Sequence, residues 1–119
     1  MGIHLNNPFV LPYKKYVATL LQTGLNAPVA NVFENDFGIV VWTRIDFGIY
    51  EASHSLFQIG KTAVFLTSGL HEDSLTLTFA GTTIGAIQIW SQKIDDSGTY
   101  IRNDDLIGET TSIEIRVYP

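Results

Sequence analysis

Hydrophobic and polar residues alternate along much of this chain with the period of a β-strand. The segment 112–118 shows the cleanest alternation, with Ile113 and Ile115 separated by polar or charged neighbours. Segments 75–79 and 86–92 follow the same pattern. A period of two places one set of side chains on a buried face and the other set in solvent. The pattern therefore predicts half-buried strands.

The central stretch, residues 37–50, combines β-branched residues and a tryptophan with turn-forming Asp and Gly. It predicts a long strand, a tight turn and a returning strand. One face of the first strand carries Ile39 and Val41, and the other carries Val40 and Trp42. A strand that is apolar on both faces is covered on both, by its own domain or by a neighbouring subunit.

Turn-forming residues separate the remaining apolar segments, and no stretch has a convincing helical period. Further strands are predicted at 13–23, 29–34, 63–68 and 99–102, with turns at 24–28, 69–73 and 80–83. About nine short strands with this spacing predict an all-β fold. The expected architecture is an antiparallel β-sandwich or a jelly-roll-like barrel.

The first twelve residues contain two prolines and predict an extended N-terminal arm, 1–12, before a single β domain, 13–119. Proline lacks an amide donor and biases the residue before it toward extended geometry. The apolar centre of the arm, Phe9, Val10 and Leu11, needs cover from the domain or from another subunit. A flexible terminus is the alternative.

The composition narrows the function classes. Charged residues make up 16% of the 119 residues, against roughly 25% in an ordinary soluble domain, so part of the surface is expected to be apolar. The net charge of -5 argues against nucleic-acid binding and against docking on an anionic membrane. There is no cysteine for a disulfide or a thiolate. We also expect no signal peptide and no membrane helix.

No residue pattern points to a catalytic, cofactor or metal site, so we do not expect an enzyme. The histidines, His4, His54 and His71, lack the close spacing of a zinc site. There is no Gly-x-Ser-x-Gly elbow and no phosphate-binding glycine loop. A Ca²⁺ site in the acidic segment 95–105 stays open as an alternative. Solvated turn residues are the favoured interpretation of that segment.

Two sets of side chains are candidates for intermolecular contacts. Oligomer contact or packing is predicted for Phe9, Val10, Leu11, Val40, Trp42 and Tyr50. Ligand binding through an exposed ring is considered for Trp90 and Tyr100. For these two, packing in the core or in an interface is the favoured alternative, because aromatic side chains bury large areas in both environments.

Three parts of the chain together resemble a known family. These are residues 21–35, the following stretch from Gly38 to Tyr50, and the closing segment 111–119. They are similar to small β-proteins encoded by tailed bacteriophages and prophages of flavobacterium-like and Bacteroides-like hosts. The resemblance is best over 20–50 and the last nine residues, whereas 51–110 matches only in character.

The resemblance implies a non-catalytic virion structural protein, such as a head or tail decoration, a spike or a fibre. Such a protein is made in the cytoplasm of the bacterial host and acts in the virion by assembly or attachment. Its expected partners are further copies of itself, with a trimer favoured, and other virion proteins. A host-surface glycan is a further candidate partner. The alternative function is a carbohydrate-binding β-sandwich module.

Overall fold

The structure is a computed structural model that describes residues 12–67, 76–94, 96–108 and 111–119. Within these residues there is no helix, and so none that could span a membrane. The strands are β1 (Lys14–Leu21), β2 (Val29–Asn35), β3 (Val41–Asp46), β4 (Ile49–Ser53), β5 (Thr62–Thr67), β6 (Thr76–Thr83), β7 (Ala86–Ile94), β8 (Tyr100–Arg102) and β9 (Thr111–Val117).

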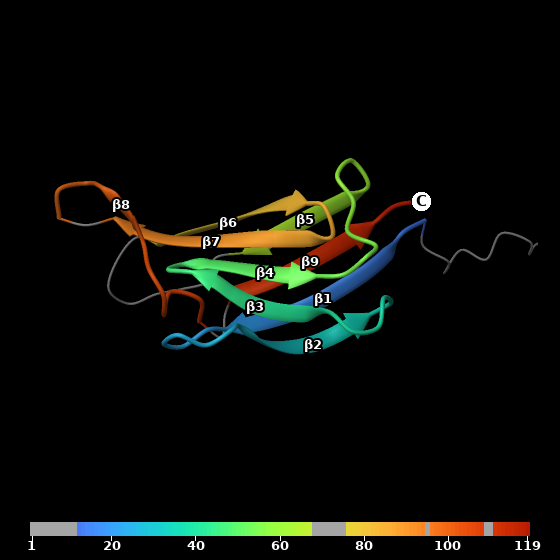
Figure 1. The fold of residues 1–119 in the computed structure, drawn as a ribbon, viewed down its shortest axis with the longest axis horizontal. Coiled ribbons are helices and arrows are strands. Elements are labelled where there is room, and N and C mark those ends of the chain that lie inside the picture. The colour runs from blue at the N-terminus through green and yellow to red at the C-terminus, as the bar shows by residue number, and fades with distance from the viewer. Residues whose placement is uncertain (1–11, 68–75, 95, 109–110) are drawn as a thin grey trace, which may run out of the picture.

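The strands form two antiparallel sheets. Sheet A has the order β2-β1-β9-β5, and sheet B has the order β3-β4-β7-β6, with the short β8 paired to the end of β7 off this path. Figure 1 shows the sheets as two layers, with β2 and β3 along one flank and β5 and β6 along the other. This confirms the all-β, sandwich-like part of the prediction. A jelly-roll-like closure stays a prediction.

The core lies between the two sheets and is built from alternate residues of their inner strands. It contains Tyr16, Ala18 and Leu20 of β1, Tyr50 and Ala52 of β4, Ile87 and Ile89 of β7, and Ile113 and Ile115 of β9, together with Phe57 and Ile107. The predicted period-two faces of β7 and β9 are therefore confirmed. Each fully buried large apolar side chain contributes about 1.5–3 kcal/mol through removal from water.

The domain itself does not cover both faces of the strand that contains Trp42. β3 begins at Val41, and Ile39 before it is 84% exposed. Val41 is also exposed, whereas Val40 and Trp42 pack partly against the core. β3 is the edge strand of an antiparallel sheet, which can leave one face in water. Cover by a neighbouring subunit stays a prediction.

The turn predicted at 80–83 is also wrong, because β6 continues through this range. Gly81 stands opposite Gln88 in an unbroken ladder with β7. Pairing with a neighbouring strand thus overrides the local preference of glycine for turns. The turn lies instead at Ile84 and Gly85, where Gly85 has a φ of +73°.

The predicted N-terminal arm falls almost wholly outside the described residues. Its contact candidates, Phe9, Val10 and Leu11, belong to the segment 1–11, which the structure does not describe. The turn predicted at 69–73 lies in the segment 68–75, which is outside the described residues as well. The proposed contacts of the arm stay predictions.

Candidate functional site

A buried polar cluster is centred on the carboxylate of Asp104, beside the turn of the β3–β4 hairpin. Asp104 is 5% exposed and accepts hydrogen bonds from Arg44 Nη2 at 2.7 Å and Nε at 3.2 Å. The hydroxyl of Tyr50 donates to it at 2.6 Å, and the backbone N–H of Gly48 donates at 3.2 Å. The cluster therefore ties the β3–β4 hairpin to the segment 103–108. The expectation of a solvated turn residue is wrong for Asp104.

The surroundings of this cluster fix its protonation state. Burial alone would raise the pKa of Asp104, but the hydrogen bonds from Arg44, Tyr50 and Gly48 outweigh burial and hold that pKa below its usual value. Burial and the bond to Asp104 raise the pKa of the Tyr50 hydroxyl far above its usual value. Neither group titrates near neutral pH, as a general acid or base would. The cluster is structural.

Gly48 lets the backbone of the hairpin reach this cluster. Its φ of +66° is a left-handed conformation that side chains disfavour. Its carbonyl accepts a bond from Ser91 N at 2.9 Å, and Ser91 Oγ donates to the carbonyl of Asn103 at 2.8 Å. A Cβ on Gly48 would lie 2.8 Å from both Asn103 N and Ser91 O. The position therefore requires a residue without a side chain.

Gln22 holds the same segment 103–108 from the other sheet. Its side chain is buried, and its Oε1 accepts a bond from the N–H of Asp105 at 2.7 Å. The backbone N–H of Gln22 donates to the carbonyl of Ile107 at 3.0 Å, and Gly24 N donates to Asp105 Oδ1 at 2.6 Å. The carboxylates of Asp104 and Asp105 thus accept hydrogen bonds from groups of the protein itself.

The described residues contain no group of three or more His, Asp or Glu side chains placed to hold a metal ion. Within them, the Ca²⁺ alternative for the segment 95–105 therefore finds no ligand cluster, and Asp95 is not among them. His54 packs between Phe37 and Phe57, with its Nε2 3.1 Å from the Phe37 carbonyl. Its Nδ1 accepts a bond from Leu56 N at 3.0 Å. Both ring nitrogens of His54 therefore lie within hydrogen-bond distance of backbone groups of the fold.

Several exposed apolar side chains lie on β2, on β3 and in the segment that joins these two strands. We call this set of side chains the β2/β3 flank and define it by Val29, Val32, Phe33, Ile39 and Val41. Ile39 is the most exposed of these side chains, and Val29 and Phe33 are 68% and 61% exposed. Six of the seven residues of β2 are exposed. This strand therefore contributes almost no buried surface to its own domain.

A bulge explains the position of Phe33. The pairing of β2 with β1 passes from Val17 opposite Glu34 to Ala18 opposite Val32, which leaves Phe33 without an opposing residue. Bulges of this kind occur at sheet edges and redirect a side chain. The residue pattern predicted the strand but not this surface, although the consecutive Val32 and Phe33 break the alternation of the strand.

The predicted contact residues of the central hairpin differ in how deeply they are buried. Val40 and Trp42 are half-buried beside the β2/β3 flank, and the indole N–H of Trp42 donates to the hydroxyl of Tyr16 at 3.2 Å. This bond joins sheet B to sheet A. Tyr50 is fully buried in the core, so its role is packing and not surface contact.

Trp90 and Tyr100 lie on the same outer face of sheet B. On β7, Gln88 and Trp90 alternate with the buried Ile87 and Ile89, and the register with β8 brings Tyr100 to this outer side. The indole N–H of Trp90 donates to Gln88 Oε1 at 3.2 Å. Trp90 is half-buried, whereas Tyr100 is 55% exposed. Neither residue belongs to the core.

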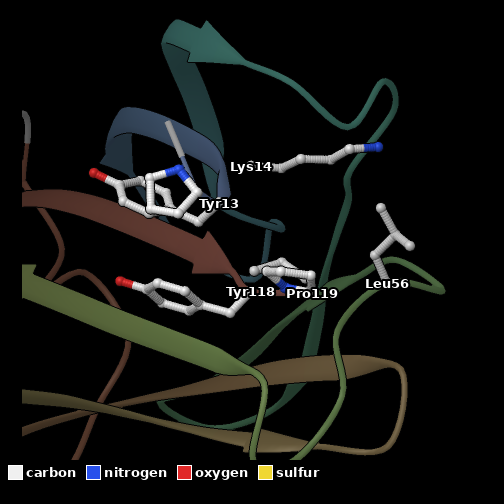
Figure 2. A pocket seen from close by; sticks show the side chains of 7 residues that line it. Tyr13, Lys14, Leu56, Tyr118 and Pro119 are labelled. Carbon is white, nitrogen blue, oxygen red and sulfur yellow. The ribbon is translucent and has the colours of Figure 1, made fainter. Parts of the chain in front are cut away.

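Two surface hollows lie among the described residues. One of about 320 Å³ lies where both ends of the described domain meet (Figure 2), and it is lined by Pro12, Tyr13, Lys14, Leu56, Val117, Tyr118 and Pro119. The rings of Tyr13 and Tyr118 lie 5.1 Å apart there. The other, of about 360 Å³, lies beside the paired strands β1 and β2. The described residues that line them contain no arrangement of nucleophile and base.

Comparisons with protein-family profiles, with curated proteins and with solved structures found no match.

Proposed function

We propose that this protein is a non-catalytic structural subunit of a bacteriophage particle, a decoration, spike or fibre component that acts by assembling with copies of itself and with other virion proteins. We infer a role in the virion from the resemblance of residues 20–50 and 111–119 to phage β-proteins. The observation that carries the assembly role is the β2/β3 flank.

The flank has the properties of an unfilled interface. An edge strand presents unpaired N–H and C=O groups, and natural proteins usually protect a long edge with charges, proline or a covering segment. Of the six exposed residues of β2, three are apolar, and the one charged residue, Glu34, pairs with Lys15. Contiguous apolar patches mark interaction sites, and we propose that the side chains of the flank form such a patch. The occupant we propose is a second copy of the chain.

A trimer is the state that we expect. In a ring of three, the β2/β3 flank of one copy would contact a different surface of the next copy, and the contact would close after three steps. A stable contact of this kind buries on the order of 800 Å² on each partner. The apolar flank and the low share of charged residues, 16%, both favour such burial.

Light scattering on a sizing column across a dilution series tests the proposal. We expect the parent chain to elute at a multiple of 13.2 kDa that resists dilution. Phe33→Ser and Val29→Ser should shift the mass toward the monomer, because each puts a hydroxyl into the apolar contact and removes buried area worth about 25 cal/mol per Å².

Ile84→Ser is the matched control. Ile84 is 91% exposed but lies in the turn between β6 and β7, away from the flank. Replacing this exposed apolar side chain by serine should leave the mass as in the parent. A parent chain that runs as a monomer at every concentration would contradict the proposal, as would equal effects of the Phe33 and Ile84 variants.

A further inference from the structure

We infer that the outer face of sheet B carries a binding site for an acidic sugar chain, of the class that bears uronic carboxylates. The site is a strip formed by Glu51, Gln88, Trp90, Tyr100 and Arg102, which we call the Trp90 strip. It lies on β4, β7 and β8 and does not involve the β2/β3 flank. The inference therefore goes beyond the proposed assembly role.

Arg102 is the central group of the strip. The other two arginines of the chain have carboxylate partners, because Arg44 pairs with Asp104 and Arg116 pairs with Glu114. Arg102 has no carboxylate partner among the described residues, and its guanidinium carbon lies 5.1 Å from the ring centroid of Trp90. Its charge is thus held in place without being neutralised.

Stacking on Trp90 orients the guanidinium of Arg102 to bind an anion. A guanidinium over an aromatic face is attracted by the ring quadrupole and loses part of its rotational freedom. Its planar N–H groups then match the two oxygens of a carboxylate. Trp90 is itself fixed, because its indole N–H donates to Gln88 Oε1 at 3.2 Å. The side chain that would contact the anion is therefore oriented before the ligand arrives.

The neighbours of Arg102 suit the remaining parts of a sugar chain. Gln88 Nε2 donates to Glu51 Oε1 at 3.0 Å, so an amide and a carboxylate lie side by side and can bind hydroxyl groups. Tyr100, two residues before Arg102, presents an exposed ring on which a sugar could stack. From Gln88 to Ile94, the partner of Tyr100, β7 advances six residues, about 20 Å. The strip is long enough for several sugar units.

The charge of the whole chain favours a specific ligand over a general polyanion. A net charge of -5 repels any anion at long range, so an anionic ligand binds only where short-range contacts hold it. A nucleic acid would need a basic stripe, which one arginine without a carboxylate partner among the described residues does not provide. An acidic sugar instead needs one charged contact surrounded by hydroxyl-binding groups, and the Trp90 strip offers this combination.

Isothermal titration calorimetry on the full chain at low salt tests the inference with three probes of equal length. These are a galacturonic acid tetrasaccharide, neutral maltotetraose and a tetraglutamate peptide. We expect the galacturonic acid tetrasaccharide to bind with a Kd below about 1 mM, and the other two to bind at least about tenfold more weakly, since each lacks either the carboxylate or the sugar ring. Absence of binding to the acidic sugar would overturn the inference. Equal binding to tetraglutamate would overturn it too, because the site would then recognise negative charge and not the sugar ring.

Variants locate the contact. Arg102→Gln should weaken binding of the acidic tetrasaccharide about tenfold or more, because it removes a charge-assisted bidentate contact. Arg116→Gln is the matched control, since Arg116 also stacks on aromatic rings, 4.8 Å from that of Tyr13, but already pairs with Glu114. Its affinity should stay within about twofold of the parent value. Equal loss in both variants would place the site elsewhere.

The result can be separated from the assembly proposal. Phe33→Ser should change the mass in solution but not the affinity for the acidic sugar, and Arg102→Gln should do the reverse. A chain that binds the sugar as a monomer would contradict the assembly proposal alone. An oligomer that fails to bind the sugar would contradict only the Trp90 strip.

Discussion

Gly48 has no room for a side chain, because the backbones of Ser91 and Asn103 approach it from two other parts of the chain. This close approach lets its N–H reach Asp104 and its carbonyl reach Ser91 N. The sequence indicated a turn here from the pattern of Asp and Gly. It could not indicate the close approach, because the two neighbours are more than forty residues away along the chain.

We expect Gly48→Ala to lower the free energy of unfolding by about 2–5 kcal/mol. The left-handed φ of +66° costs a side chain roughly 1–2 kcal/mol, and the 2.8 Å contacts of the new Cβ with two backbones add strain on the order of 1–3 kcal/mol. Urea denaturation followed by circular dichroism measures the loss.

Gly24→Ala is the control for the strain of the backbone alone. Gly24 has a similar φ of +57°, but nothing lies within 4 Å of the position that a Cβ would take. The loss should be about 1–2 kcal/mol. Equal losses in the two variants would show that the packing around position 48 contributes nothing to stability.

At the scale of elements, alternation was enough to find most strands but not the segment 103–108. The acidic residues of that segment, Asp104 and Asp105, are predicted from composition to be solvated turn residues. In the structure, Leu106 and Ile107 are buried, and Asp104 is bonded to Arg44, sixty residues earlier. Local composition reports polarity, but it does not report a distant partner that makes a polar residue suitable for burial.

The bond between this segment and the β3–β4 hairpin should depend on pH. The pKa of Asp104 is lower in the folded chain than its usual value, so its charged form stabilises the fold. This contribution is complete above the unfolded pKa of about 4. It is lost as the pH falls through the lower, folded pKa.

Asp104→Asn should therefore lower the free energy of unfolding by about 2–4 kcal/mol at pH 7, because Arg44 loses its buried partner. The difference between parent and variant should narrow as the pH falls below about 4, since the parent then loses the same charge. Urea denaturation at several pH values between 7 and 2 measures this difference. A difference that stays constant over that range would show that the charge of Asp104 does not stabilise the fold.

At the scale of the whole molecule, the composition predicted an apolar surface but not its place. The low share of charged residues, 16%, applies to every face equally. The place follows from sheet order, which makes β2 and β3 edge strands on one flank, and from the bulge that directs Phe33 outward. Sheet order depends on pairings between distant segments, such as β1 with β9, which alternation within one strand does not specify.

If the β2/β3 flank is an interface between copies, thermal stability depends on protein concentration. A partner that binds only the folded chain stabilises it by mass action, by roughly 2.7 kcal/mol for a hundredfold excess over the dissociation constant. For a chain of this size, each kcal/mol raises Tm by about 3–5 °C. We therefore expect the Tm of the parent to rise by about 5 °C or more over a hundredfold increase in concentration.

Circular dichroism melts of three chains at matched concentrations test this dependence. Phe33→Ser should melt at a Tm that does not change with concentration, since its flank no longer binds a second copy. Ile84→Ser, whose side chain is exposed in the β6–β7 turn, should keep the slope of the parent. A parent chain whose Tm is independent of concentration would contradict self-association through the β2/β3 flank. The exposed apolar side chains of β2 would then have to contact a different virion protein.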